Sequence, residues 1–166
     1  MPNWCECDLT IEGPHEDVCS FLAYCGDGFD FNKFIPYPAK FAELDEAAAK
    51  WEAEHPEGPW SERPTDGFNS GGMEWCRRHW GTKWNASDVV MPTPPTPDGY
   101  DETEINFSTP WSPPLPVVHA ASVKFPTLTF ELRYFERGME FNGIYRVNAG
   151  AVDRDEKGPY FDKRGG

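Results

Sequence analysis

The amino-acid sequence predicts an α+β fold in which two helices cover one face of an antiparallel sheet. Three observations lead to this prediction. Several segments alternate apolar and polar residues, which is the pattern of a strand with one buried face. Two segments repeat apolar residues every three or four positions, as an amphipathic helix does. With residues 29–80 left aside, the order of these segments is strand, helix, strand, strand, helix, strand, strand.

The N-terminal residues predict a strand followed by a helix. Residues 3–12 form the strand, because every second residue from Cys5 onward is apolar and the residues between are polar. Gly13-Pro14 ends this strand. The helix is predicted to stop at Gly26, a residue type that is common at helix C-termini. Its apolar residues, at helical spacing, are Val18, Phe21, Leu22 and Cys25.

Residues 29–80 predict an insertion between the first helix and the second strand. The first part, 29–39, is aromatic and contains two prolines, so it predicts an extended connector. Residues 41–54 predict a modestly amphipathic helix. Residues 57–72 are rich in Pro, Gly, Ser and acidic residues and predict a mobile loop. A short helix is expected over residues 73–78.

The middle of the second half predicts two strands and the second helix. Residues 84–91 and 103–109 are expected as strands on either side of a proline-rich turn. The helix is expected over residues 114–124, with Ser112 as its N-cap and prolines tolerated in its first turn. Its small-residue face is expected to consist of Val117, Ala120, Ala121 and Val123.

The C-terminal part completes the predicted fold with strands over residues 127–135 and 139–152. This order of elements is the ferredoxin-like split βαβ arrangement, βαββαβ, with one extra C-terminal strand. We therefore expect a single ferredoxin-like domain over residues 1–152, with a largely helical and loop insertion at 29–80. The charged, glycine-rich residues 153–166 predict a flexible C-terminal tail.

The net charge of −13 lies mainly in the first third of the chain. Residues 1–62 carry 14 acidic and 3 basic side chains. A protein that follows a nucleic-acid backbone needs a basic surface, so this charge argues against direct nucleic-acid binding. The acidity favours solubility, and it would also attract a partner that has a basic surface.

The sequence also predicts a cytoplasmic protein with free thiols. It has no apolar run long enough to span a membrane and no basic and apolar leader at its start, so no membrane partner is expected. The number of cysteines is odd and their spacing is irregular, which argues against a disulfide framework. The five cysteines are Cys5, Cys7, Cys19, Cys25 and Cys76.

No sequence motif assigns a reaction or a cofactor. The sequence has no P-loop, G-x-G-x-x-G or G-x-S-x-G motif, so we expect no cofactor and no catalytic residues. Zinc would need four converging ligands, and Cys5, Cys7, Cys76 and His79 could supply them. Cysteines beside aliphatic residues are more often part of a core, so we expect no metal. Cys76 is also the best candidate for a thiol nucleophile, because basic residues follow it.

The best candidate binding site is the segment 75–84, in which basic residues alternate with tryptophans. Trp and Arg dominate binding hot spots, and both can stack on nucleotide bases. Trp75 and Trp84 could instead wedge the insertion against the sheet. The candidate ligand- or partner-binding residues are Trp75, Arg77, Arg78, His79, Trp80, Lys83, Trp84 and Trp111.

Three parts of the sequence resemble a known family. They are Met1-Pro2-Asn3-Trp4-Cys5 with Leu9-Thr10-Ile11-Glu12-Gly13, then Trp80-Gly81-Thr82-Lys83-Trp84, and then Trp111-Ser112-Pro113-Pro114 followed by Phe125-Pro126, Leu128-Thr129-Phe130, Tyr134, Glu136 and Gly138. In these parts the chain resembles the YubB-like family of small ferredoxin-like proteins, which phages, plasmids and integrative elements carry. It departs from the family pattern at Cys7, where a polar residue is expected. The resemblance covers residues 1–15 and 73–145; it implies an accessory mobile-element protein and brings no established activity.

Two hypotheses for the function follow, in order of preference. The first is a non-enzymatic binding protein that engages a host or mobile-element protein through the acidic insertion and the Trp/Arg segment, for example to counter a host defence system. The second is a protein that holds a nucleotide-like small molecule between Trp80 or Trp111 and the basic residues Arg77, Arg78 and Lys83. An enzyme with a carboxylate or thiol site is the least favoured class. The exposed strand edges of such a sheet leave a homodimer open.

Overall fold

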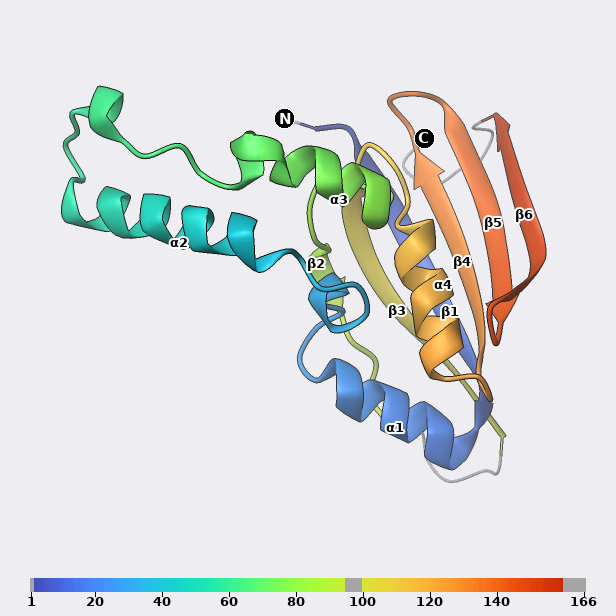
Figure 1. The fold of residues 1–166 in the computed structure, drawn as a ribbon. Coiled ribbons are helices and arrows are strands. Elements are labelled where there is room, and N and C mark those ends of the chain that lie inside the picture. The colour runs from blue at the N-terminus through green and yellow to red at the C-terminus, as the bar shows by residue number, and fades with distance from the viewer. Residues whose placement is uncertain (1, 95–99, 160–166) are drawn as a thin grey trace.

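An antiparallel sheet forms the body of the protein (Figure 1). The computed structural model describes residues 2–94 and 100–159. In this part of the chain the strands are β1 (Trp4–Pro14), β2 (Ser87–Val90), β3 (Tyr100–Pro110), β4 (Thr129–Glu136), β5 (Phe141–Asn148) and β6 (Ala151–Pro159). They form a six-stranded sheet in the order β2-β3-β1-β4-β5-β6. β1 is therefore central and pairs with β3 on one side and with β4 on the other.

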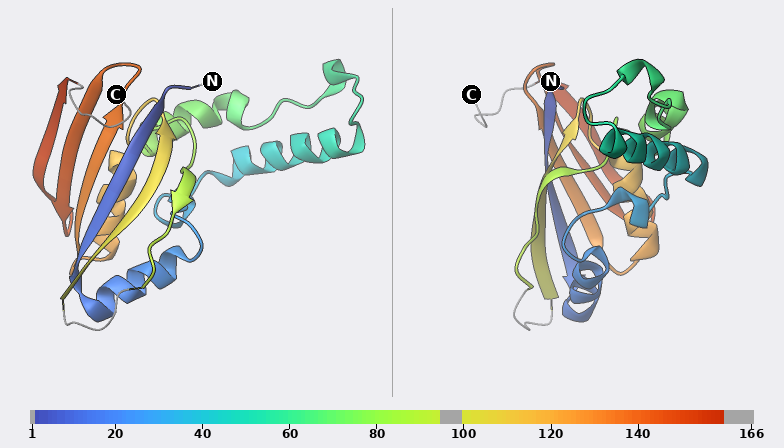
Figure 2. Two further views of the ribbon diagram at one scale, coloured as in Figure 1. Left: turned by 180° about the vertical axis from the view of Figure 1, so that it is seen from behind. Right: turned by 90° about the vertical axis from the view of Figure 1, so that its left-hand side faces the viewer.

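The helices lie on one side of this sheet, as the edge-on view in Figure 2 shows. They are α1 (His15–Cys25), α2 (Ala39–Glu54), α3 (Met73–His79) and α4 (Leu115–Lys124), with short helical turns η1 (Phe31–Lys33), η2 (Trp60–Glu62) and η3 (Phe68–Gly72). α1 contacts β1 and β3, and α4 contacts β4 and β5. No helix in the described part of the chain is long and apolar enough to cross a membrane.

The core lies between the sheet and the helices α1 and α4. The odd-numbered residues of β1 are buried, and Leu9 lies opposite Ile105 of β3 and Leu132 of β4. Phe21 of α1 packs edge-on against Phe130 of β4, with ring centroids 5.2 Å apart. The alternation of apolar and polar residues thus predicted correctly which side of the central strands faces the helices.

The face of the sheet away from the helices is polar. Arg146 of β5 bridges Glu12 of β1 and Glu131 of β4, at 2.9 and 3.0 Å. The carboxylate of Glu136 is instead fully buried on the helix side, where it accepts hydrogen bonds from two backbone N–H groups of the following turn. These glutamates therefore stabilise the sheet and its β4–β5 turn.

The predicted final strand, 139–152, is in fact two strands. β5 and β6 are joined by a hairpin at Ala149-Gly150, where both residues have positive φ, as a two-residue turn requires. β6 includes residues 153–159, which were predicted to belong to the flexible tail. Charged residues are tolerated on this edge strand because their side chains are exposed, and they hinder its pairing with another chain. The rest of the predicted tail, 160–166, lies outside the described residues.

α4 forms where predicted, but its N-cap and part of its buried face differ. Pro114 occupies the N-cap position, and no side chain caps the helix. The Ser112 hydroxyl instead donates to the carbonyl of Gly81 at 2.7 Å. Val123 is 57% exposed rather than part of the small-residue face. The buried residues of α4 are Val117, Val118, Ala121 and Ser122.

β2 is shorter than the strand predicted over residues 84–91, and it starts only at Ser87. Asn85 holds the preceding segment against the connector instead of the sheet. Its Oδ1 accepts from the backbone N–H of Phe31 at 3.0 Å, and its Nδ2 donates to Asp30 at 2.7 Å. Because the Asn85 side chain is hydrogen-bonded to the connector, this residue does not pair within the sheet, and β2 begins only at Ser87.

The insertion leaves the body as a projecting arm, which we define as residues 39–72 (Figures 1 and 2). α2 confirms the helix predicted over 41–54 and runs away from the sheet, and the chain then returns beside it. The predicted loop, 57–72, contains the two helical turns η2 and η3. The connector before the arm is not extended throughout, because it contains η1, whose Phe31 is buried in the core.

Candidate functional site

Trp80, which follows α3, is part of the core. Its side chain is only 3% exposed, and its ring packs edge-on against Phe31 with centroids 5.7 Å apart. Its Nε1 donates to the carbonyl of Ile35 at 2.8 Å. A buried indole whose N–H has a partner is a structural anchor, and too little of its surface is exposed to hold a ligand.

The loop that follows Trp80 is fastened to the end of β3 by side-chain hydrogen bonds. Trp111 directly follows the end of β3. Its φ is positive, at 71°, and its side chain is 41% exposed. Few residues other than glycine adopt this backbone conformation, so the surrounding bonds must hold it. These bonds run from Thr82 Oγ1 to Pro110 O (2.8 Å), from Ser112 Oγ to Gly81 O (2.7 Å) and from Thr109 Oγ1 to Ser112 O (2.9 Å).

A groove of about 610 Å³ opens beside Trp111. Its volume is within the range of about 300–1,000 Å³ that is typical of small-molecule sites. It is lined by α3, by the joined loops and by the strands β5 and β6. We call this feature the groove; its main lining residues are Arg77, Lys83, Trp111, Met139, Phe141 and Lys157.

The groove is basic in a protein that is strongly acidic. Its described lining residues include Arg77, Lys83 and Lys157 and no acidic residue. Within the described part of the chain, none of these three side chains has a carboxylate oxygen within 4.0 Å. Lys157 Nζ lies 3.8 Å from the ring centroid of Phe141, a cation–π contact. The groove is thus a local positive site with apolar walls.

The groove joins three of the residues that the sequence suggested for binding with others that it did not suggest. Arg77, Lys83 and Trp111 come from the predicted set. Met139 and Lys157 were not predicted, because they reach the groove only through the β4–β5 turn and the β5–β6 hairpin. No local motif in the sequence could have identified them.

The other predicted binding residues on and after α3 lie outside the groove. Trp75 stacks on His79, with ring centroids 4.6 Å apart and an angle of 26° between the rings. Trp84 meets Trp4 of β1 edge-on at 6.1 Å. Arg78 is exposed and does not line the groove.

The cysteines considered as zinc ligands are buried. Cys5 and Cys7 lie in the core on β1, and burial raises the pKa of Cys7. Burial also raises the pKa of Cys76 to about 11, with Asp45 contributing, so this thiol stays protonated at neutral pH. Among the described residues, no group of three or more His, Cys, Asp or Glu side chains is placed to hold a metal ion.

A polar chain at the start of α1 was not predicted. The carboxylate of Asp101 on β3 contacts Nδ1 of His15, and Sγ of Cys19 lies 3.6 Å from Nε2 of His15. The spacing of four residues on the helix brings the thiol beside the imidazole, and the pairing of β1 with β3 brings the carboxylate. A carboxylate, an imidazole and a thiol in this order form the arrangement that activates thiol nucleophiles.

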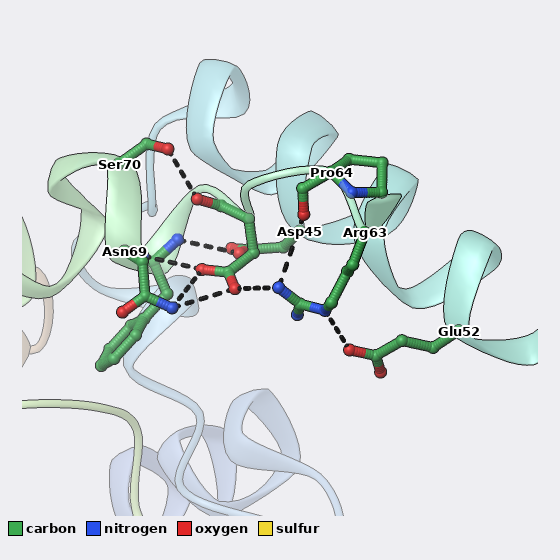
Figure 3. Close-up of polar contacts among 8 residues, drawn as sticks. Asp45, Glu52, Arg63, Pro64, Asn69 and Ser70 are labelled. Carbon is green, nitrogen blue, oxygen red and sulfur yellow. Dashed lines mark hydrogen bonds and ion pairs between the residues drawn. The ribbon is translucent and has the colours of Figure 1, made fainter. Parts of the chain in front are cut away.

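A network of polar contacts holds the two halves of the arm together (Figure 3). Arg63 donates to Glu52 of α2 and, at 2.8 Å, to Asp66. Asp66 also accepts from the backbone N–H of Asn69 at 2.7 Å. Asp45 of α2 accepts from the first N–H of η3 at 2.9 Å. The bond from Asn69 and then the one from Arg63 lower the pKa of Asp66 to about 2.

Two glycines allow close contact where the arm returns to the body. A Cβ at Gly67 would lie 1.9 Å from the carbonyl oxygen of Phe41, so only glycine fits against α2 there. A Cβ at Gly72 would lie 1.9 Å from the hydroxyl of Tyr37. The last residue of the arm therefore lies against the connector that precedes it.

Comparison with known proteins identifies similarity at the level of the fold. Residues 79–159 match the model of a family described as the ferredoxin-like domain in Api92-like protein. The crystal structure of a protein api92 from Yersinia pseudotuberculosis aligns with 98% of this chain and 99% of its own, with a TM-score of 0.54 and 11% sequence identity. No curated protein matches.

These comparisons confirm the ferredoxin-like part of the expectation for residues 79–159. The matched residues include Lys83, Trp111 and Lys157 of the groove but neither Arg77 nor the arm. The similarity to the api92 structure extends the likeness in fold to nearly the whole chain. The resemblance to the YubB-like family and an origin in phages or plasmids stay predictions.

Replacing Trp80 should damage the fold, whereas replacing Trp111 should not. We expect Trp80→Ala to lower the free energy of unfolding by about 3–5 kcal/mol, because it empties a core site. Trp111→Ala should change it by less than about 1 kcal/mol, because much of that indole is already exposed. Urea denaturation followed by circular dichroism measures both, and equal losses would contradict the separation of core from groove.

Cys19 should be the thiol that reacts in the folded protein, because the other four cysteines are buried. Under native conditions, iodoacetamide should alkylate one cysteine per chain, and peptide mass spectrometry should locate it at Cys19. His15→Ala should slow the reaction, because the imidazole beside the thiol is then missing as a proton acceptor. An unchanged rate in this variant would show that the imidazole takes no proton from Cys19.

The arm network should loosen in acid. The folded protein holds the pKa of Asp66 at about 2, below the usual value of about 4. The charged carboxylate therefore stabilises the arm fully above about pH 4, and this stabilisation is lost as the pH falls through about 2. The NMR signal of the Asn69 amide should titrate with a midpoint at about pH 2, and Asp66→Asn should abolish the transition. A midpoint at about pH 4 would contradict the network.

Proposed function

We propose that this protein is a non-enzymatic binding protein of a phage or other mobile element, which engages a basic protein surface with its arm. The resemblance of its sequence to the YubB-like family supports the mobile-element origin. The strand order β2-β3-β1-β4, extended by β5 and β6, supports a split βαβ body that serves as the scaffold. Capture of a host protein by such an element would suit a role against host defence.

The observation that carries this proposal is the projection of the arm with little of its own surface buried (Figure 1). α2 has 16 residues and buries only Ala48. Trp60 of η2 is 58% exposed, and Leu44 of α2 is 41% exposed. Large exposed apolar side chains on a projecting element are typical of protein-binding surfaces.

The charge of the arm indicates the chemistry of the partner. Residues 39–72 carry 8 acidic and 3 basic side chains. Several of the glutamates are exposed and have no ion-pair partner in the described part of the chain. A partner with a basic surface would complement them and would be steered toward the arm. These exposed glutamates are Glu43, Glu46, Glu54, Glu57 and Glu62.

The internal contacts of the arm support binding by a preformed surface. Arg63 links α2 to the returning segment, and Asp66 closes the turn that precedes η3. An element that is already ordered loses less conformational entropy when it binds. The arm can therefore present Trp60 and the glutamates in one arrangement before a partner arrives.

The test is capture of partner proteins by the wild-type protein and by a variant whose arm is neutral. The arm variant carries Glu→Gln at the five exposed glutamates. A matched control has five exposed acids of the body changed to amides, at Glu16, Glu102, Glu140, Asp153 and Asp155. A basic protein captured from a host lysate is then purified, and its affinity is measured by calorimetry at two salt concentrations.

We expect the arm variant to bind this partner at least about tenfold more weakly. The body control should bind nearly as tightly as the wild type. Trp60→Ala should weaken binding without a change in salt dependence, because it removes an apolar contact. Equal losses in the arm variant and the body control would show that only the net charge matters, and would refute the proposal.

A further inference from the structure

We propose that the groove binds a free mononucleotide, with its phosphate among Arg77, Lys83 and Lys157 and its base against Trp111. This proposal goes beyond the binding of a protein by the arm and does not depend on it. The groove lies on the body, and none of the arm residues 39–72 lines it.

The phosphate end of the site follows from the three basic side chains. Arg77 comes from α3, Lys83 from the loop after Trp80 and Lys157 from β6, so three separate elements bring like charges to one groove. None has a carboxylate partner within 4.0 Å in the described part of the chain. Like charges that line one groove repel each other, and an anion in the groove would offset that repulsion. A phosphate monoester carries close to two negative charges and several acceptor oxygens, which suits this arrangement.

The base end of the site follows from the exposed indole of Trp111. Hydrogen bonds on either side of Trp111 hold its backbone, and the indole remains 41% exposed. Stacking of a base on an aromatic side chain contributes about 1–3 kcal/mol. Met139 and Phe141 supply apolar surface on the same groove. A ligand that carries both an aromatic ring and a phosphate would use the apolar side of the groove and its basic side together.

The size of the groove and the charge around it favour a single nucleotide over a polymer. The volume of about 610 Å³ suits a molecule of nucleotide size. A longer strand would continue from the groove onto the surface of a protein with a net charge of −13. Its further phosphates would be repelled there, because binding of a nucleic-acid backbone needs a basic track.

The test is titration calorimetry of the full chain with AMP, GMP, CMP and UMP at low salt. At least one of them should bind with a Kd below about 1 mM. Adenosine and inorganic phosphate, the two halves of AMP, should each bind at least about tenfold more weakly than the best mononucleotide. If no mononucleotide binds at concentrations up to about 10 mM, the proposal is wrong.

Matched variants show whether the groove is the site. Arg77→Ala and Lys157→Ala should each weaken mononucleotide binding by about tenfold. Arg78→Ala is the control, because Arg78 is exposed on the same helix and does not line the groove. Trp111→Ala should weaken binding of the mononucleotide but not of inorganic phosphate. The two charge variants keep the test valid if this change disturbs the loop.

Two further outcomes would overturn the proposal. One is an equal loss of affinity in Arg77→Ala and Arg78→Ala, which would indicate general charge attraction. The other is tighter binding of a single-stranded oligothymidylate than of any mononucleotide, with loss of that binding in Lys157→Ala, which would make the groove a polymer site. The variant with a neutral arm should bind the mononucleotide as the wild type does, so failure of the arm proposal would not affect this result.

Discussion

The burial of Trp80 determines where both the arm and the groove lie. Its indole N–H holds the carbonyl of Ile35 just before the arm begins, and its ring packs against Phe31 in the core. Trp75, in the helix that follows the arm, meets the same indole edge-on at 5.5 Å. The chain that continues from Trp80 forms the loop that carries Lys83. One enclosed side chain thus fixes the start of the arm, its end and one wall of the groove relative to the sheet.

Two carboxylates on the strand that leads toward the groove have partners other than the basic residues of the groove. Glu136 stands three residues before Met139 of the groove, but it is buried and accepts from backbone N–H groups. Glu131 on the same strand pairs with Arg146 on the other face of the sheet. Exposed acids lie on the arm and also over the rest of the body, but none of the described lining residues of the groove is acidic. A chain with a net charge of −13 can therefore contain a groove with unpaired cations.

The parts of the fold that depend on local pattern could be predicted from the sequence, and the parts that depend on distant pairing could not. Alternation identified the buried side of the central strands, and helical spacing identified α1 and α2. β6 was missed because its charged residues resemble a tail, although an edge strand needs only backbone partners. Ser112 fits a helix cap locally, but its hydroxyl bonds to Gly81 across the fold. In the groove, Arg77 and Lys83 belong to the segment 75–84, whose basic and aromatic residues are visible in the sequence. Lys157 reaches the groove only because the β5–β6 hairpin places it there, and no sequence motif predicts this.

The contact of Tyr37 with Gly72 brings the two ends of the arm to one point of the body. An insertion whose ends meet can change in length or sequence without altering the register of the strands that carry it. The sheet and the arm could therefore evolve at different rates, because packing constrains the sheet and does not constrain the exposed surface of the arm. If the protein serves as proposed, this separation would allow a new target to be acquired by changes in the arm alone.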